Sequence, residues 1–182
     1  MDMYFTALVL PAELNEQILP LKRRMQERYG CTVGLKSPAH ITLLPPFWMH
    51  PTLEQELRAD LDSFAATRAP LAVHTRNFSA FRPRTIFIDV LVNEALAALK
   101  VANDAWFAAR PQYGARIDRR PFHPHITIAT RDLRKAAFFE AWPEFESAAF
   151  DATWTARGIG LLHHNGRSWD VVHTAYFVNR QS

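Results

Sequence analysis

The sequence predicts a mixed fold of helices and strands in which two halves repeat one order of elements. Each half runs from a strand through a helix to a short strand that opens with His-Ile-Thr. That tripeptide begins 37 residues after Met3 in the first half and 40 residues after Thr85 in the second. No linker or change of composition separates the halves, so we expect residues 1–182 to form a single bilobal domain.

Apolar and β-branched residues predict the strands, and apolar residues at helical spacing predict the helices. Strands are expected over residues 3–10, 40–44, 71–78, 84–92 and 125–129, and helices over 11–30, 52–64, 94–109 and 132–141. Two further strands should flank Asn165-Gly166, a dipeptide that favours a tight hairpin. Proline should interrupt two elements: Pro20 should kink or divide the first helix, and Pro45-Pro46 should end the strand that begins at His40.

The composition is that of an ordinary folded protein. Apolar residues make up 48% of the chain and charged residues 21%, which excludes a disordered, collagen-like or low-complexity protein. Cys31 is the only cysteine, so an intramolecular disulfide and a zinc site of several thiolates are excluded. No apolar stretch reaches the length of about 18 residues that a membrane span needs, and Asp2 stands where a signal peptide would be basic. We therefore expect a cytoplasmic protein without a membrane partner.

Positive charge gathers in one segment of the chain. The formal net charge is only +3, which is too small by itself to indicate a nucleic-acid binder. Residues 110–135, however, hold seven of the 21 Lys and Arg residues and only two of the 18 Asp and Glu residues. The segment that contains the second His-Ile-Thr thus carries the whole positive excess.

The repeated tripeptides, His40-Ile41-Thr42 and His125-Ile126-Thr127, are the candidate catalytic residues. In a strand, residues i and i+2 lie on one face about 6.6 Å apart, so each motif presents an imidazole beside a hydroxyl. Two such strands facing each other would place two histidines and two threonines around one cavity. One histidine could then act as general base and the other as general acid, while the hydroxyls donate to phosphate oxygens. This arrangement suits phosphodiester chemistry and requires no metal.

Two copies of the motif carry more weight than one. A single His-Ile-Thr in a strand is common by chance, and its histidine is then an ordinary core or surface residue. Here both copies open a short apolar strand, and each is preceded within two residues by a proline, Pro38 or Pro124. Both also occupy matching places in the repeated order of elements. We therefore favour a shared catalytic role over coincidence.

These motifs resemble those of the two-histidine phosphoesterase superfamily, which includes the RNA 2',3'-cyclic phosphodiesterases, also called 2'-5' RNA ligases. The resemblance rests on residues 40–47, with Pro45-Pro46-Phe47 after the first motif, and on residues 121–129. The opening strand that ends at Pro11 and the Asn165-Gly166 hairpin are similar to the family layout as well, so most of the chain is covered. The resemblance implies a bilobal α+β fold, with two pseudo-symmetric antiparallel sheets, outer helices and a central cleft where the motifs meet.

The resemblance also implies an activity. It is metal-independent hydrolysis of a cyclic or 2'-5' linked phosphodiester, with His40 and His125 as the acid-base pair and Thr42 and Thr127 as phosphate anchors. The substrate would be an RNA end or a small cyclic nucleotide, no cofactor would be needed, and ligation would be the reverse reaction. We expect the protein to act as a monomer.

Four residues outside the motifs are candidates for substrate binding. Many relatives that act on RNA ends carry an arginine where this chain has Thr130, and Arg131 follows one residue later. Because a one-residue shift reverses the face of a strand, Arg131 reaches the cleft only if the strand has ended before it. Arg119 and Arg120 are alternative phosphate contacts, and Phe47 is a candidate for stacking on a nucleobase.

Two alternatives stay open from the sequence. His123 and His125, which lie on one strand face, could join His40 in a three-histidine metal site, although no carboxylate partner stands beside them. The chain could also be a nucleotide-binding or RNA-binding module without turnover. Permanently charged arginine would serve binding better than histidine, so the duplicated histidines favour an enzyme. Tyr4 and Phe5 on the first strand are weaker candidates for stacking on a nucleobase. His163, His164 and His173, in or near the C-terminal hairpin, are expected to be partly buried or to line the cleft.

Overall fold

A computed structural model describes residues 1–178 of the chain. Its strands are β1 (Asp2–Val9), β2 (His40–Met49), β3 (Leu71–Phe81), β4 (Thr85–Leu91), β5 (His125–Ala129), β6 (Thr153–Ala156), β7 (Gly158–His164) and β8 (Trp169–Tyr176). Its α-helices are α1 (Ala12–Tyr29), α2 (Glu54–Ala65), α3 (Glu94–Ala108) and α4 (Lys135–Ser147). Short 3-10 helices cover Val33–Lys36 (η1), Pro51–Leu53 (η2) and Pro111–Tyr113 (η3).

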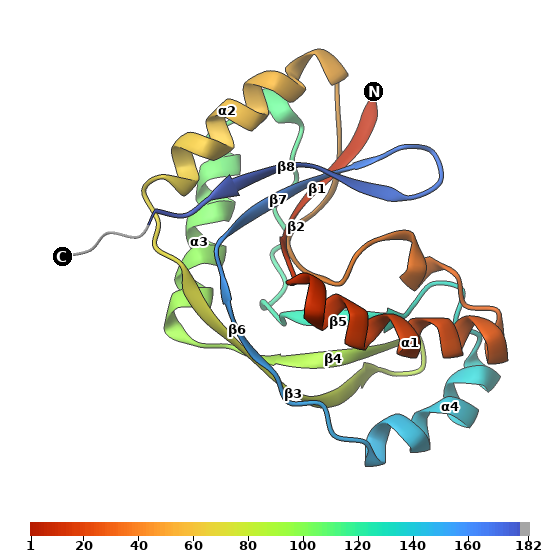
Figure 1. The fold of residues 1–182 in the computed structure, drawn as a ribbon. Coiled ribbons are helices and arrows are strands. Elements are labelled where there is room, and N and C mark those ends of the chain that lie inside the picture. The colour runs from red at the N-terminus through yellow and green to blue at the C-terminus, as the bar shows by residue number, and fades with distance from the viewer. Residues whose placement is uncertain (179–182) are drawn as a thin grey trace.

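The strands form two four-stranded antiparallel sheets, in the orders β2-β1-β7-β8 and β5-β4-β3-β6. Figure 1 shows α2 and α3 beside the first sheet and α1 and α4 beside the second. The predicted α+β fold with two similar antiparallel sheets and outer helices is confirmed. The two halves repeat in their pairing as well: β1 and β4, which open the two halves, each pair with the strand that carries a motif.

The two motif strands lie at matching edges of their sheets. Each pairs with one neighbour only in the described sheets, β2 with β1 and β5 with β4, and β2 and β5 contact each other. Ala7 lies opposite Thr42 on the first sheet, and Phe87 lies opposite Thr127 on the second. Because the edges meet, the side chains of both motifs reach the space between the sheets.

The helices connect the two halves crosswise. Helix α1, which follows β1 of the first sheet, contacts β5 of the second, and Arg24 of α1 pairs with Glu144 of α4 at 2.5 Å. Helix α3, which follows β4, contacts β2, and its Trp106 packs against Phe64 of α2 with ring centroids 5.4 Å apart. One continuous cluster of buried apolar residues includes side chains from both sheets. The single-domain assignment stays a prediction, and this packing supports it.

Proline does not interrupt the elements as expected. Helix α1 runs from Ala12 to Tyr29 with Pro20 inside it, on the exposed side. Strand β2 continues past Pro45-Pro46 to Met49, with irregular pairing to β1 beside the prolines. Pro20 therefore does not divide the helix, and Pro45-Pro46 do not end the strand, because an edge strand tolerates the loss of an N–H donor.

The second half agrees with the sequence except near its ends. Helix α4 begins at Lys135 and runs to Ser147, later at both ends than the expected 132–141, because Asp132 belongs to the turn before it. The short strand β6 was not predicted, whereas the hairpin of β7 and β8 around Asn165-Gly166 is confirmed. Within residues 1–178, none of the helices combines the length and apolar character needed to cross a membrane.

Candidate active site

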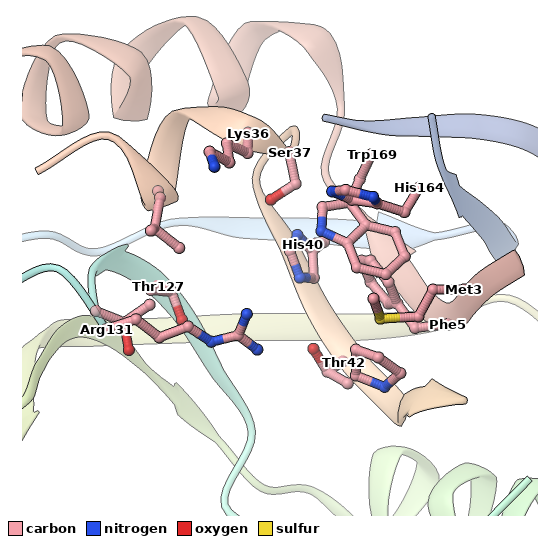
Figure 2. A pocket seen from close by; sticks show the side chains of 14 residues that line it. Met3, Phe5, Lys36, Ser37, His40, Thr42, Thr127, Arg131, His164 and Trp169 are labelled. Atoms are coloured by element: carbon pink, nitrogen blue, oxygen red, sulfur yellow. The ribbon is translucent and has the colours of Figure 1, made fainter. Parts of the chain in front are cut away.

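A pocket of about 330 Å³ lies where the two sheets meet, and both motifs contribute to it. His40 and Thr42 line it from β2, and Thr127 lines it from β5 (Figure 2). The alternation of side chains along a strand places Ile41 and Ile126 in the core and turns the polar residues the other way. The motifs therefore meet at one pocket, as the duplicated pattern predicts.

Each motif histidine forms the same kind of hydrogen bond, from its ring to a backbone carbonyl oxygen two residues before it. Nδ1 of His40 lies 2.7 Å from the carbonyl oxygen of Pro38, and Nδ1 of His125 lies 2.7 Å from that of His123. A carbonyl oxygen only accepts hydrogen bonds, so each Nδ1 carries a proton and donates it. Each Nε2 is then the nitrogen that gains or loses a proton. The two imidazoles are fixed in the tautomer that general acid-base catalysis through Nε2 requires.

A phenylalanine on the neighbouring strand supports each imidazole. Phe5 of β1 packs against His40 with ring centroids 4.9 Å apart, and Phe87 of β4 packs against His125 at the same distance. Phe81 of β3 adds an edge contact to His125 at 5.2 Å. His125 itself is half-buried and is not among the residues that line the pocket. The supporting contacts thus repeat in the two halves, while access to the two rings differs.

The surroundings lower the pKa of both histidines. Burial lowers the pKa of His40 from 6.5 to about 4, and the charges of Lys22 and His125 act in the same direction, against the hydrogen bond to Pro38. Burial also lowers the pKa of His125, helped by His123 and opposed by the backbone hydrogen bond and by Asp89. Both imidazoles are therefore neutral at pH 7 in the ligand-free protein. The effect of the His125 charge on His40 also shows that the two rings lie within electrostatic reach of each other.

Arg131 reaches the pocket, because β5 ends at Ala129 before the face alternation can exclude it. Its backbone has a φ of +50°, and the Asp132 N–H donates to the Thr130 carbonyl oxygen at 2.5 Å, which closes a tight turn around it. Figure 2 shows the Arg131 side chain extending from beside Thr127 toward His40 and Thr42. The sequence-based condition for its participation is thus met.

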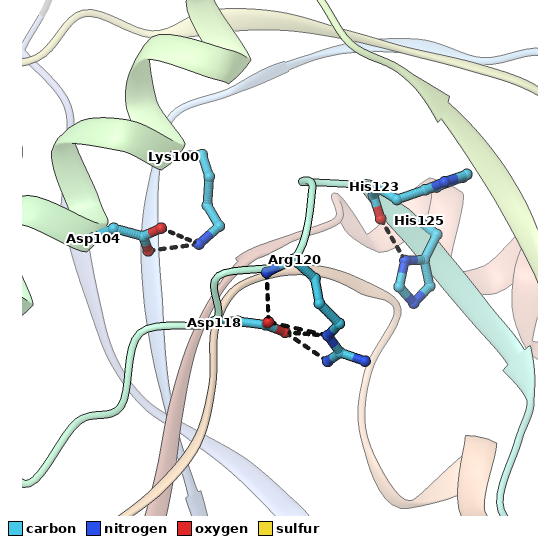
Figure 3. Close-up of polar contacts among 6 residues, drawn as sticks. All are labelled: Lys100, Asp104, Asp118, Arg120, His123 and His125. Atoms are coloured by element: carbon cyan, nitrogen blue, oxygen red, sulfur yellow. Dashed lines mark hydrogen bonds and ion pairs between the residues drawn. The ribbon is translucent and has the colours of Figure 1, made fainter.

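The other predicted binding residues lie elsewhere. The Arg120 side chain donates hydrogen bonds from Nε and Nη2 to the Asp118 carboxylate (Figure 3) and is 85% exposed. Neither Arg120 nor Arg119 lines the pocket. Phe47 is only 3% exposed and packs against Tyr4 and Phe107, so the expectation that it stacks on a nucleobase is wrong. The reason is that β2 continues beyond its prolines, and its alternation turns Phe47 into the core.

Several pocket residues escaped the sequence analysis. Lys36 and Ser37 line the pocket just ahead of the first motif, and Met3 and Trp169 form an apolar wall together with Phe5. Of the three histidines expected to be partly buried or to line the cleft, His164 lines the pocket, whereas His163 and His173 lie beside the carboxylates of Asp2 and Asp62. Trp169 lies at the start of β8 and packs edge-on against Phe5, with centroids 4.7 Å apart. No local pattern marks it, because its position depends on the pairing of distant strands.

The three-histidine metal alternative finds no geometric support. Figure 3 shows His123 and His125. The partner of the His123 ring is the Asp89 carboxylate, 3.1 Å from its Nε2, rather than a shared site with His40. Within residues 1–178, no three His, Cys, Asp or Glu side chains are grouped closely enough to bind a metal ion.

Comparisons with known proteins agree with this fold and site. The profile described as the 2'-5' RNA ligase superfamily matches residues 10–168. No curated protein matches the sequence. Among solved structures, TT0787 of Thermus thermophilus superposes with a TM-score of 0.71 at 18% identity, covering 98% of this chain and all of that one.

Two E. coli LigT structures are also similar. The complex with 3'-AMP has a TM-score of 0.67 at 19% identity over 98% of this chain and 99% of LigT, and the NADP+ complex has the same score and identity over 98% of each. At these identities the structural likeness shows only the fold. The family is shown by the matching profile, which spans residues 10–168. The protein therefore belongs to the 2'-5' RNA ligase superfamily of two-histidine phosphoesterases.

Proposed function

We propose that this protein is a metal-independent phosphodiesterase that opens 2',3'-cyclic phosphates on RNA ends or nucleotides. Membership of the superfamily supports phosphoesterase chemistry in general. The observation that carries the specific proposal is the matched pair of imidazoles, each with Nδ1 held at 2.7 Å from a backbone carbonyl oxygen. Such a pair leaves Nε2 of each imidazole as the nitrogen that exchanges a proton.

The reaction divides the work between the two histidines. One neutral imidazole takes a proton from water as the water oxygen forms a bond to phosphorus. The bond from phosphorus to the ribose oxygen breaks, and the other imidazole, protonated, gives its proton to that oxygen. The product is a phosphomonoester beside a free ribose hydroxyl. In this proposal Thr42 and Thr127, which both line the pocket, donate hydrogen bonds to the non-bridging phosphate oxygens.

The pocket suits a nucleotide because its two sides differ in character. Arg131, Lys36 and Ser37 offer positive charge and a hydroxyl for a phosphate. Phe5 and Trp169 offer an apolar wall for a nucleoside. The pocket volume of about 330 Å³ is at the small end of the range for ligand sites, which fits one nucleotide rather than a long strand. The similar protein LigT was solved with 3'-AMP and with NADP+, which supports a nucleotide as ligand.

One observation favours the alternative of a binding module. The pKa values of both His40 and His125 are lowered, so the free protein lacks a protonated imidazole at pH 7. In the catalytic proposal, the negative charge of the bound phosphate raises these pKa values and supplies the acid. In the binding alternative, both rings stay neutral and no bond is broken. The reverse reaction, 2'-5' RNA ligation, is a further outcome of the same chemistry.

Incubation with a panel of substrates separates these functions. The panel holds the four 2',3'-cyclic nucleotides and a short RNA that ends in a cyclic phosphate, each with EDTA present, and products are identified by mass and chromatography. The proposal predicts monophosphate products with the native protein and with His50→Ala, an exposed loop histidine. It predicts loss of product with His40→Ala and His125→Ala. Binding of the panel without turnover would support the binding module instead.

A further inference from the structure

The backbone at Arg131 adopts a conformation that L-residues rarely use. Its φ of +50° is in the left-handed region, which is unfavourable for a residue with a β-carbon. Among residues 1–178, Asn77 is the only other residue besides glycine with a positive φ. Strain of this kind persists only where surrounding contacts hold it, and it gathers at functional sites. The contacts that hold this turn therefore matter for the pocket.

Asp132 supplies those contacts. Its backbone N–H closes the turn by donating to the Thr130 carbonyl oxygen. Its side-chain Oδ2 accepts the backbone N–H of Thr32 at 2.6 Å, that of Val33 at 3.0 Å and the Thr32 hydroxyl at 3.2 Å. The two amides belong to Thr32, the N-cap residue of η1, and to Val33, its first residue. The Thr32 side chain accepts no hydrogen bond from the start of η1, so the Asp132 carboxylate takes the place of a capping side chain. One carboxylate thus ties the Arg131 turn to η1.

Both tied segments line the pocket. The turn contributes Thr130 and Arg131, and η1 contributes Val33, Gly34 and Lys36. Asp132 forms no ion pair with Arg131, and within residues 1–178 no carboxylate lies within ion-pair distance of the Arg131 guanidinium. Only Oδ2 of Asp132 is hydrogen-bonded to η1, and its buried Oδ1 has no hydrogen-bond partner among the described residues. The Arg131 guanidinium is left without a carboxylate partner and can bind an anion.

We propose that Asp132 is a positioning residue that aims Arg131 at the substrate phosphate and fixes its distance from η1. This inference rests on the proposed function only in taking the anion to be a phosphate. A simple charge effect would act the other way, because removing a negative charge beside the pocket should strengthen phosphate binding. Weaker binding after removal of Asp132 is therefore a sign of lost positioning.

A double-mutant cycle tests the proposal. Binding of inorganic phosphate and of 3'-AMP is measured by calorimetry for the native protein, Asp132→Ala, Arg131→Ala and the double variant. Arg131→Ala should weaken binding by about 10-fold to 100-fold, the usual range for a hydrogen bond to a charged group. Asp132→Ala should weaken it by about 10-fold, and by less than about 2-fold when Arg131 is already alanine. Asp132→Asn, which keeps an acceptor oxygen for the η1 amides, should recover most of the affinity.

Kinetics add a second measurement where the panel identifies a substrate. Asp132→Ala should raise KM more than it lowers kcat, since both histidines stay in place. Asp132→Ala weakening binding equally with and without Arg131, or leaving it unchanged or stronger, would overturn the proposal. If Asp132→Ala does not fold, Thr32→Ala replaces it in the same cycle, and additive effects of Thr32→Ala and Arg131→Ala overturn the proposal equally. Because phosphate binding is read directly, the proposal is tested even if the protein turns over no substrate.

Discussion

At the scale of single residues, the hydrogen bond from each motif histidine to a backbone carbonyl decides the chemistry. Both imidazoles hold a proton on Nδ1, so Nε2 is the nitrogen that exchanges a proton with the substrate or with water. Replacing His40 or His125 by alanine should lower kcat by about 10²-fold to 10⁴-fold while binding stays measurable. The double variant should lose less than the product of the two single losses, because base and acid act on one displacement. Steady-state kinetics on the identified substrate measure this, and strictly multiplicative losses would contradict a concerted pair.

The pKa values of the two histidines predict an acidic optimum for kcat/KM. Activity needs one neutral and one protonated imidazole, and kcat/KM reports on the free protein. Since the pKa of His40 is about 4 and that of His125 is lowered from 6.5, the maximum should lie between about pH 4 and 6.5. Activity should fall toward pH 8 as the last imidazolium loses its proton. The maximum of kcat should lie at higher pH, because bound phosphate raises both pKa values. A kcat/KM that stays flat from pH 5 to pH 8 would argue against this pair.

Lys22 is a buried cation that should lower stability. It is only 4% exposed, its Nζ donates to the Ser37 carbonyl oxygen at 3.1 Å, and burial lowers its pKa from 10.5 to about 8. The folded state disfavours the charged form, so the penalty is complete below pH 8 and disappears as pH rises to 10.5. Lys22→Met should therefore raise the free energy of unfolding at pH 7, by about 1–3 kcal/mol once the lost hydrogen bond is counted.

Urea unfolding at pH 7 and at pH 10.5 measures the effect of Lys22. The gain should be largest at pH 7 and small at pH 10.5, whereas Arg23→Met, at an exposed position on the same helix, should change little at either pH. A Lys22→Met protein less stable than the native one at pH 7 would mean that the hydrogen bond to Ser37 outweighs the desolvation of the charge.

At the scale of elements, the contact between η1 and β5 holds the pocket together. A β-carbon added at Gly34 would lie 2.3 Å from the carbonyl oxygen of Ile128, so only glycine fits there. Gly34→Ala should push η1 off the strand beside Thr127, lowering the free energy of unfolding by about 1–3 kcal/mol and raising KM. Gly30→Ala is the matched control, because it meets no atom within 4 Å but has a φ of +72°. It should lower stability without changing KM, and equal kinetics for both variants would show that η1 does not shape the site.

The limits of prediction from sequence also lie at this scale. The two-residue period of a strand correctly placed His40 and Thr42 on one face, because both lie inside one regular segment. The prediction for Phe47 failed because the strand was expected to end at Pro45-Pro46, whereas β2 continues to Met49 as an edge strand. Arg131 could only be predicted conditionally for the same reason. Local patterns therefore predict the positions within an element better than its boundaries.

At the scale of the whole molecule, the repeat predicted both the two sheets and the meeting of their motifs. What the sequence did not contain in any local form is the rest of the pocket. Trp169 reaches it through the pairing of β7 with both β1 and β8, and Lys36 through the packing of η1 on β5. Each of these positions depends on contacts between segments far apart in the chain. Duplication made the motif residues predictable as candidates, whereas the other residues that line the pocket belong to no repeated pattern and were largely not predicted.

The arrangement of the whole pocket predicts that activity survives removal of metal ions. In the proposed mechanism, the two histidines supply the proton transfers, and Arg131 and Lys36 supply the positive charge that a Lewis acid would otherwise provide. Protein dialysed against EDTA and assayed with EDTA present should therefore keep full kcat on the identified cyclic phosphate. Added zinc or manganese should bring no increase. Loss of activity in EDTA that zinc or manganese restores would show that a metal ion takes part, and the threonines and arginine would then need other roles.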